Sequence, residues 1–417
     1  MKILKNIPLI SNYICLISAV AFTAVLPFYF VHQRVVVAIF FISYILDFIL
    51  NKQWNSFRKD KSMYVFIGFI FFFLLVPFYH LFESSSRFYI DALEVYLPFL
   101  CFGIIGLFGY NRLFKLRYFA YTTIITSFAL ICFLVVKTIG IQEFIALPFT
   151  EKMMLFAFKR IEYINNHMIF NIYMNVSFIF VFYLLFSEEK IISRWGKIIV
   201  AIIGVVIYYA LFISDGRTGF ITGNLILLFF LLKYIVNKRK WILGTIAAVA
   251  LLCIAIFIIQ NHSRMQKDEI DKEPRLYIWE IAEKTILEKP ILGHGASDGR
   301  EVFLQKGIEN VDIIEADNIK EDFIIGKAHP HNQYLQSLIS FGAIGLLSLI
   351  FIFISPIIIS IKQKQIWFYL ALFVSIFVIQ SCFEIFGVGL SAIIYTFFIT
   401  LFFQQKNQSN TNYKRLL

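Results

Sequence analysis

Long apolar stretches recur throughout this chain of 417 residues, and they constrain its fold more than any other feature. Hydrophobic residues make up 59% of the sequence and charged residues only 16%, whereas charged residues reach about 25% in soluble domains. About twenty consecutive apolar residues cross a bilayer as a helix, because a helix satisfies its backbone hydrogen bonds within the segment. The sequence therefore predicts an all-α integral membrane protein.

We expect about twelve membrane-spanning helices from the positions of these stretches. They are 8–30, 35–51, 63–82, 92–110, 118–139, 168–187, 198–213, 218–236, 241–260, 338–361, 366–384 and 387–404. The second, seventh and twelfth are short and are the least able to span on their own. The chain starts with MKILKN and lacks a small-residue cleavage site after the first apolar run, so we expect that run to be kept as a span rather than removed as a signal peptide.

Lysine and arginine are concentrated in alternate connections between the predicted spans. The connections after the even-numbered spans are the basic ones, namely NKQWNSFRKDK, YNRLFKLR, SEEKIISRWGK, NKRK and KQK. Because short basic connections stay in the cytoplasm, both termini are expected there. The net charge of +11 fits this topology and anionic lipid or phosphate ligands, and in so apolar a chain it does not indicate nucleic acid.

The predicted spans divide the chain into three parts. Residues 1–260 hold nine spans, residues 261–337 form one large loop on the outer side, and residues 338–417 hold three spans and a cytoplasmic tail. Within the loop, RLYIWEIAEKTILEKP is predicted to be an amphipathic helix that ends at Pro290, and the following GHGASDGR is predicted to be a loop. The expected apolar face of the helix consists of Leu276, Trp279, Ala282 and Ile286.

The sequence HNQYLQSLISFGAIG places His331 at the head of an apolar helix. Gly342 and Gly345 come later on the same helical face as His331. Small residues on such a face let another backbone approach closely, as they do between membrane helices. A histidine held there can act as a general base near neutral pH, although an ordinary helix start with a polar residue has the same pattern.

Two arginines stand at positions suited to phosphate binding. Arg217 lies in SDGRTG, a short outer turn in which glycines flank it. Its guanidinium can bind a phosphate there through two hydrogen bonds, or it can merely extend toward lipid headgroups. Arg275 opens the amphipathic helix, where a cation opposes the helix dipole. Either a salt bridge to Glu273 or Asp271 or a second phosphate contact explains that position.

Three further residues are candidates for binding substrate or supporting the site. Arg160 and His167 precede the sixth span, and Glu384 ends the eleventh. A carboxylate at membrane depth usually faces a cavity or a partner. Together with the histidine and the two arginines above, these residues all fall on the outer side in a topology derived from other loops. Such a set fits a diphosphate-bearing lipid with a transferable headgroup.

We expect neither a metal site nor a cofactor. His294, His329 and His331 lie close in sequence, but the His-Pro-His spacing is not a helical pair. Pro330 favours an extended kink, which should turn the rings of His329 and His331 in different directions. The five cysteines all lie in apolar runs, where they act as small buried hydrophobes and not as ligands.

In its motifs and their order, the chain resembles the O-antigen ligase family of bacterial envelope glycosyltransferases. His331, Asn332, Gly342 and Gly345 match the family motif of His, then Asn, Ser or Gln, nine residues, Gly, two residues and a final Gly. SDGRTG is similar to the family's arginine turn, and RLYIWEIAEKTILEKPILGHG is similar to its segment of an arginine, a helix and Pro-x-x-Gly-x-Gly. The twelve spans and the large loop agree as well. Glu384 departs from the pattern, because the family has an aspartate there.

The resemblance implies a multi-span, lipid-dependent glycosyltransferase of the bacterial inner membrane, with cytoplasmic termini and a periplasmic active site and loop. Such an enzyme transfers a polysaccharide from undecaprenyl diphosphate to a sugar of the lipid A core. Its expected partners are therefore this lipid-linked glycan, the lipid A core acceptor and membrane lipids. The resemblance also implies that Arg217 and Arg275 bind the diphosphate without a metal. His331 would take the acceptor proton, and Asn332 would support it, in a single inverting displacement.

Three other functions share parts of this pattern. An O-antigen polymerase of the same superfamily uses the same donor, with a growing glycan as the acceptor. A related oligosaccharyltransferase acts on protein hydroxyls, but those chains usually carry a large additional soluble domain. A transporter or flippase of lipid-linked oligosaccharide also has many spans. Transporter sites lie near the membrane midplane in broken helices, whereas the candidates here gather at one face.

We predict that the loop 261–337 lies in the periplasm and that NKRK lies in the cytoplasm, because the basic connections determine the orientation. Fusions of a topology reporter after Gln260 and after Lys240 should give opposite signals. The same signal at both positions would contradict the topology and, with it, a periplasmic site.

Overall fold

The computed structural model describes the backbone of most of the chain as α-helix. The described residues are 2–28, 33–110, 113–138, 140–147, 167–186, 192–214, 217–238, 249, 275–310, 317–362, 364–386 and 390–414. Their helices are α1 (Lys2–Val25), α2 (Gln33–Leu50), α3 (Met63–His80), α4 (Tyr89–Phe108), α5 (Leu116–Thr138), α6 (Ile141–Ala146), α8 (His167–Phe186), α9 (Arg194–Ile213), α10 (Arg217–Lys238), α13 (Arg275–Glu288), α14 (Ala296–Glu309), α15 (Asp317–Ile324), α16 (Gln333–Ser360), α17 (Lys364–Gln380) and α18 (Ser391–Lys414). A short 3-10 helix covers Gln53–Ser56, and the described residues include no β-strand.

Eight helices of the described part are long and apolar enough to cross a membrane. They are α1, α3, α4, α5, α8, α9, α10 and α16, and each overlaps a predicted span. The predicted span 35–51 forms α2. The last two predicted spans, 366–384 and 387–404, correspond to shorter apolar helices, Ile366–Ser381 and Ser391–Gln404. The predicted span 241–260 lies outside the described residues. The prediction of an all-α membrane protein is confirmed, and the number twelve stays a prediction.

Helix α8 lies at the centre of one group of spans. It is 83% buried over its span, compared with at most 50% for the other seven, because α5, α9, α10 and α17 pack around it. Its Asn175 amide donates to the Gly219 carbonyl at 2.9 Å, and the Ser214 hydroxyl donates to Asn171 at 2.9 Å. A side chain at position 219 would collide with Asn171. These contacts fix the start of α10 against the first turns of α8.

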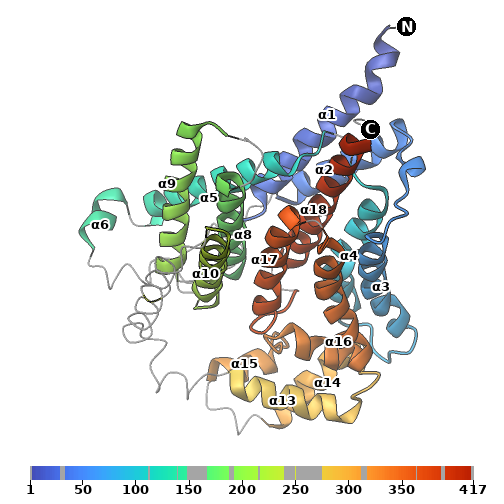
Figure 1. Cartoon of the computed structure of the whole chain (residues 1–417). Helices are drawn as coiled ribbons and strands as arrows, with labels where there is room; N and C mark the ends of the chain where they lie inside the picture. The colour runs from blue at the N-terminus through green and yellow to red at the C-terminus, as the bar shows by residue number, and fades with distance from the viewer. Residues whose placement is uncertain are drawn as a thin grey trace.

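A second group of spans is formed by α3, α4, α16 and α18 (Figure 1). Helix α3 packs on α4 and α16, and α4 packs on α18. Phenylalanine side chains fill the space between them, and Phe66, Phe69, Phe99 and Phe102 are fully buried. Neighbouring rings meet edge to face, as Phe69 and Phe99 do at a centroid distance of 5.7 Å, which is a favoured geometry for aromatic pairs.

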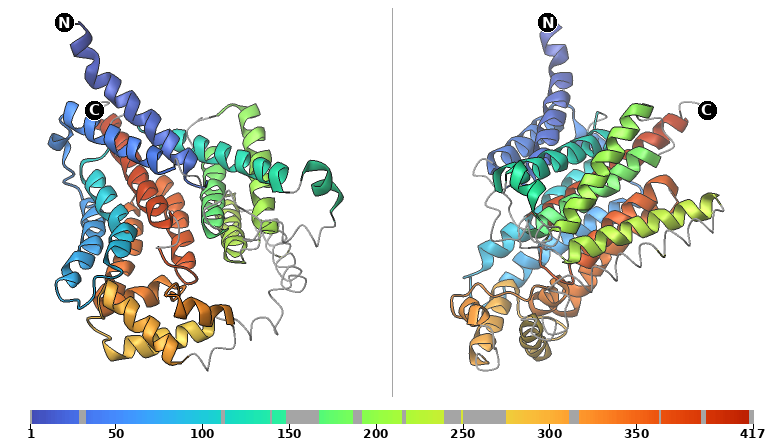
Figure 2. Two further views of the ribbon diagram at one scale, coloured as in Figure 1. Left: turned by 180° about the vertical axis from the view of Figure 1, so that it is seen from behind. Right: turned by 90° about the vertical axis from the view of Figure 1, so that its left-hand side faces the viewer.

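Helices α13, α14 and α15 form a layer across one end of these spans (Figures 1 and 2). The start of α1 and the end of α18 lie at the opposite end, an arrangement that fits the predicted topology. The layer has its own hydrophobic core, to which helices α13 to α16 all contribute. Its buried members are Phe88, Ile278, Ile281, Ala282, Phe303, Leu304, Ile319, Phe323, Ala328 and Ile339.

Two expectations about this layer hold only in part. On α13, Ala282 is buried and Trp279 and Ile286 pack against the core of the layer as expected, whereas Leu276 is 52% exposed. The buried positions of α13 are Ile278, Ile281, Ala282 and Thr285, because the helix packs against both α14 and α16. The segment GHGASDGR is a loop only as far as Gly295, since α14 begins at Ala296. The helix that contains the predicted span 338–361 begins at Gln333, five residues earlier.

Helix α16 is broken at Gly342, where φ is 58° and ψ is −150°. The loop between α13 and α14 inserts at this point. The amides of His294 and Gly295 donate to the carbonyls of Ile339 and Ser340 at 2.9 and 2.7 Å, and the Ala343 amide donates to the Pro290 carbonyl at 3.0 Å. The loop therefore satisfies backbone groups that the break would leave unpaired. Gly342 lets another backbone approach closely, as the pattern predicted, but that backbone is the loop at Ile291 and Gly293 and the helix is broken there.

We predict that Gly342→Ala destabilises the protein by roughly 1–3 kcal/mol, the range for a residue forced into a disfavoured backbone conformation. The new methyl group would also collide with the Ile291 carbonyl. Thermal unfolding of the purified protein in detergent measures the effect. Gly196→Ala is the matched control, because a methyl group there meets its nearest neighbours at 3.4 Å. Equal melting temperatures for the two variants would contradict the account of the break.

Candidate active site

His331 lies in the turn that leads into α16, one residue before the residue that caps the helix. Its φ of 48° places it in the left-handed region, which is uncommon for residues other than glycine but several-fold enriched in histidine. Asn332 is the cap, and its side chain accepts hydrogen bonds from the amides of Tyr334 and Leu335. Such a cap is worth about 1 kcal/mol. The helix thus begins at Gln333, and His331 stands outside it rather than on its first turn.

The segment after α17 closes over this turn. The Gln333 amide donates to the Ser381 carbonyl at 2.8 Å, and the Phe386 amide donates to the Gln333 side-chain oxygen at 2.7 Å. The Asn332 side chain donates to the Cys382 carbonyl at 3.2 Å. These bonds hold Glu384 beside His331, although the two residues are far apart in the sequence.

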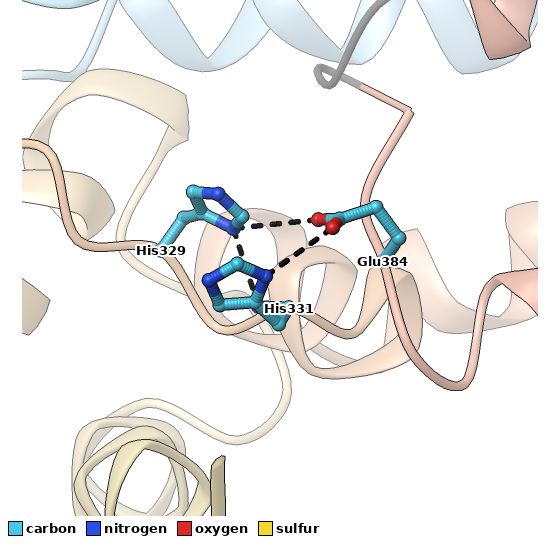
Figure 3. A group of neighbouring side chains, drawn as sticks. All are labelled: His329, His331 and Glu384. Atoms are coloured by element: carbon cyan, nitrogen blue, oxygen red, sulfur yellow. Dashed lines mark hydrogen bonds and ion pairs between the residues drawn. The ribbon is translucent and has the colours of Figure 1, made fainter. Parts of the chain in front are cut away.

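His331 and Glu384 form a close pair (Figure 3). The distance from His331 Nδ1 to Glu384 Oε2 is 3.3 Å, and the Glu384 side chain is only 8% exposed. Burial alone would raise the pKa of Glu384, but the hydrogen bond with His331 and the electrostatic effects of the two neighbouring histidines outweigh it and lower that pKa. The amide of Ile385 also donates to Oε1 at 3.1 Å. The carboxylate is therefore ionised and is held on both oxygens.

His329 lies directly against His331, with ring centroids 3.8 Å apart and an interplanar angle of 40°. The expectation that Pro330 turns the two rings apart is wrong, because the left-handed backbone at His331 folds the second ring back onto the first. The Trp279 indole donates to the Pro330 carbonyl at 2.9 Å and holds the turn. His329 Nδ1 accepts the His331 amide at 3.3 Å.

His329 stays neutral in this setting. Burial, followed by the electrostatic effects of His331, Arg300 and Arg275, outweighs the opposing effect of Glu384 and lowers its pKa to about 4. Arg275 is the first residue of α13, as predicted. Its positive charge helps to lower the pKa of His329, so the arginine lies near the pair. Of the candidates, the structure therefore brings His331, Asn332 and Glu384 into contact and Arg275 into their electrostatic neighbourhood.

Arg300 contributes to this neighbourhood, and the sequence pattern did not single it out. Its guanidinium lies over the ring of Phe88 at 4.2 Å, donates to the Gly326 carbonyl at 3.2 Å and approaches Asp91 at 3.4 Å. The positive charge of Arg300 helps to lower the pKa of His329. The only signal in the sequence is its place at the end of GHGASDGR, a segment predicted to be a loop, whereas the structure places Arg300 in α14.

Two of the remaining candidates, Arg217 and His167, are the first residues of α10 and α8. Arg217 is the first residue of α10, and its side chain lies outside the described part. His167 begins α8, and its neighbour Met168 accepts a hydrogen bond from Gln380 at 3.3 Å, four residues before Glu384. These contacts connect the start of α8 to the loop that carries Glu384. Arg160 lies outside the described residues.

Comparison with known proteins relates part of the chain to a family. The family model described as O-antigen ligase matches residues 199–350. A Rickettsia typhi protein named as a candidate polysaccharide ligase is 30% identical over 169 residues, or 39% of each chain. An uncharacterised Haemophilus influenzae protein is 31% identical over 181 residues, which is 39% of this chain and 43% of its own length. The chain thus matches about two fifths of the length of these two relatives.

The matched region contains much of the site described above. Arg217, Arg275, His331 and Asn332 all lie within it, whereas Glu384 lies beyond its end. The helices of the region, from α9 to α16, are the ones that carry the arginine turn, the layer and the broken helix. Residues 199–350 of this membrane protein are thus similar to the O-antigen ligase family.

Proposed function

We propose that this protein is an O-antigen ligase of the bacterial inner membrane. It transfers a polysaccharide from undecaprenyl diphosphate to a sugar of the lipid A core at the periplasmic face. The family match and the relative named as a candidate polysaccharide ligase support the reaction class. The observation that carries the proposal is the 3.3 Å contact between His331 Nδ1 and the buried carboxylate of Glu384.

The pair of His331 and Glu384 has the arrangement of an oriented general base. An ionised carboxylate only accepts hydrogen bonds, so Nδ1 of His331 carries the proton in this contact. The unprotonated Nε2 of the neutral ring is then free to accept a proton. Glu384 also stabilises the imidazolium that forms, which is the role that a carboxylate plays beside a catalytic histidine.

Transfer then proceeds in one displacement. As His331 Nε2 takes the proton of the acceptor hydroxyl, that oxygen attacks the anomeric carbon of the donor. The bond from this carbon to the diphosphate oxygen breaks, the diphosphate leaves with the electron pair, and the configuration at carbon inverts. Arg217 and Arg275 bind the diphosphate and stabilise its growing charge, so the proposal needs neither a metal nor a cofactor.

The placement of the residues supports a site at the membrane surface. His331 and Glu384 both follow or precede apolar helices, and the layer α13–α15 lies at the same end (Figure 1). Under the predicted topology, this end faces the periplasm and both termini face the cytoplasm. Arg160 and His167 would then support substrate binding from the start of α8. Membrane lipids would surround the spans, and the lipid-linked donor would enter from among them.

An O-antigen polymerase uses the same donor, and its acceptor is a growing glycan. Purified protein supplied with the lipid-linked glycan, and with either the lipid A core or a lipid-linked acceptor, separates the two functions. Product on the lipid A core alone supports a ligase. Product only on the lipid-linked acceptor would replace this proposal with a polymerase.

His331→Ala should reduce transfer by about 100-fold or more, the usual range for a general base being 10²–10⁴, while donor binding is retained. Transfer and donor binding are measured on the same nanodisc preparation. Glu384→Gln should lower kcat with little change in KM, and Glu384→Asp should restore part of it. Transfer by His331→Ala within about tenfold of the wild type would remove the role of base. Because His329 packs on His331, His329→Ala should have an intermediate effect.

Arg217→Lys should lower transfer by about 10- to 100-fold, since lysine keeps the charge but loses the paired hydrogen bonds of the guanidinium. Losing one charge-assisted contact costs roughly 1.5–3 kcal/mol. The assay compares low and saturating donor, with membrane insertion as the control for folding. Arg34→Lys, at the start of α2, should leave transfer unchanged. An unaltered rate in Arg217→Lys at both donor levels would show that Arg217 only reaches toward the headgroups.

A further inference from the structure

We infer that His329, His331 and Glu384 also form a binding site for a divalent transition-metal ion such as Zn²⁺, and that the ion inhibits transfer when it binds. The three side chains come from two separate segments and meet at one point (Figure 3). One ligand atom from each lies within 4.8 Å of the other two. The inhibitory part rests on the proposed function, whereas binding does not.

The spacing of the ligand atoms is close to that of a tetrahedral site. Zinc binds histidine nitrogen and carboxylate oxygen at about 2.0–2.1 Å, so ligand atoms in a regular tetrahedron lie roughly 3.3–3.4 Å apart by the same measure. The Nδ1 atoms of His331 and His329 lie 3.3 and 3.7 Å from the oxygens of Glu384. Small side-chain rotations therefore bring all three groups onto one ion.

The chemistry of the three ligands favours zinc and its neighbours over calcium or magnesium. Imidazole nitrogen suits Zn²⁺, Cu²⁺ and Ni²⁺, while sites made of oxygen ligands suit the alkaline-earth ions. The two histidine side chains are 24% and 31% exposed, so an ion can reach them. The fourth position is left to water, as in zinc sites with three protein ligands.

Two features weaken the site and set the affinity that we expect. His329 Nδ1 already accepts the His331 amide at 3.3 Å, and an ion would displace that long hydrogen bond. The positive charges of Arg300 and Arg275 reach His329 and repel a cation. We therefore expect micromolar rather than nanomolar binding, which suits an ion that inhibits and is released.

Inhibition follows from which nitrogen of His331 the ion occupies. A neutral imidazole carries one proton. When the ion takes the lone pair of Nδ1, the ring changes tautomer and its proton moves from Nδ1 to Nε2, so Nε2 can no longer accept the proton of an acceptor hydroxyl. The ion also draws Glu384 away from its hydrogen bond with the ring. A single binding event therefore removes both the base and its orienting carboxylate.

Binding of Co²⁺ and Zn²⁺ to the purified protein in nanodiscs tests the site without donor or acceptor. Co²⁺ should give the visible absorption of a four-coordinate site, and Zn²⁺ should abolish it. His329→Ala and Glu384→Ala should each weaken binding by about 10- to 100-fold. His80→Gln is the matched control, because it removes a histidine that pairs with Glu83 at 3.0 Å elsewhere, and it should bind like the wild type.

Transfer assays then measure the consequence. Micromolar Zn²⁺ should inhibit the wild type, and EDTA should restore the full rate, whereas Mg²⁺ should have no effect. Absence of binding, or binding that His329→Ala and Glu384→Ala leave unchanged, would overturn the site. Stoichiometric binding without inhibition would overturn the regulatory part. Binding in a protein that shows no transfer at all would instead count against the proposed function.

Discussion

The geometry of the site depends on the exchange of backbone hydrogen bonds at the break in α16. A helix at the membrane edge cannot leave carbonyls unpaired, because an unsatisfied buried polar group costs about 1–3 kcal/mol. In the loop after α13, the amides of His294 and Gly295 donate to carbonyls of α16. The Pro290 carbonyl of the same loop accepts a hydrogen bond from the Ala343 amide. One contact therefore fixes the layer α13–α15 on the spans. It also fixes the distance between Arg275 at the start of α13 and His331 at the start of α16.

The same contact explains why a glycine is needed both at position 293, in the loop after α13, and at position 342, in α16. A side chain at position 293 would collide with the backbone of residues 340–342, and one at position 342 would collide with Ile291 and Gly293. Both glycines also have positive φ, 73° and 58°. Neither motif could fold this way without the other, because each backbone occupies the space that a Cβ of its partner would need.

The electrostatics of the site follow from burial combined with a few hydrogen bonds. An unpaired carboxylate in the interior costs several kcal/mol. Glu384 is tolerated because His331 and the Ile385 amide bind its two oxygens. His329 is buried beside them and stays neutral, since Arg300 and Arg275 add to the cost of charging it. An ionised carboxylate, an oriented histidine and a neutral histidine are thus held within one small volume.

The amino-acid sequence by itself determined the all-α membrane fold, because apolar runs of about twenty residues allow little else in a bilayer. It also identified His331, Asn332 and Glu384 as candidates, since polar groups at the ends of apolar helices are costly and few. Only the tertiary structure decided that they touch and that the rings of His329 and His331 lie against each other. It also decided that α16 breaks at Gly342 and that the charge of Arg300 acts on His329. These features arise between segments far apart in the chain and from one left-handed backbone angle at His331, and neither leaves a periodic pattern in the sequence.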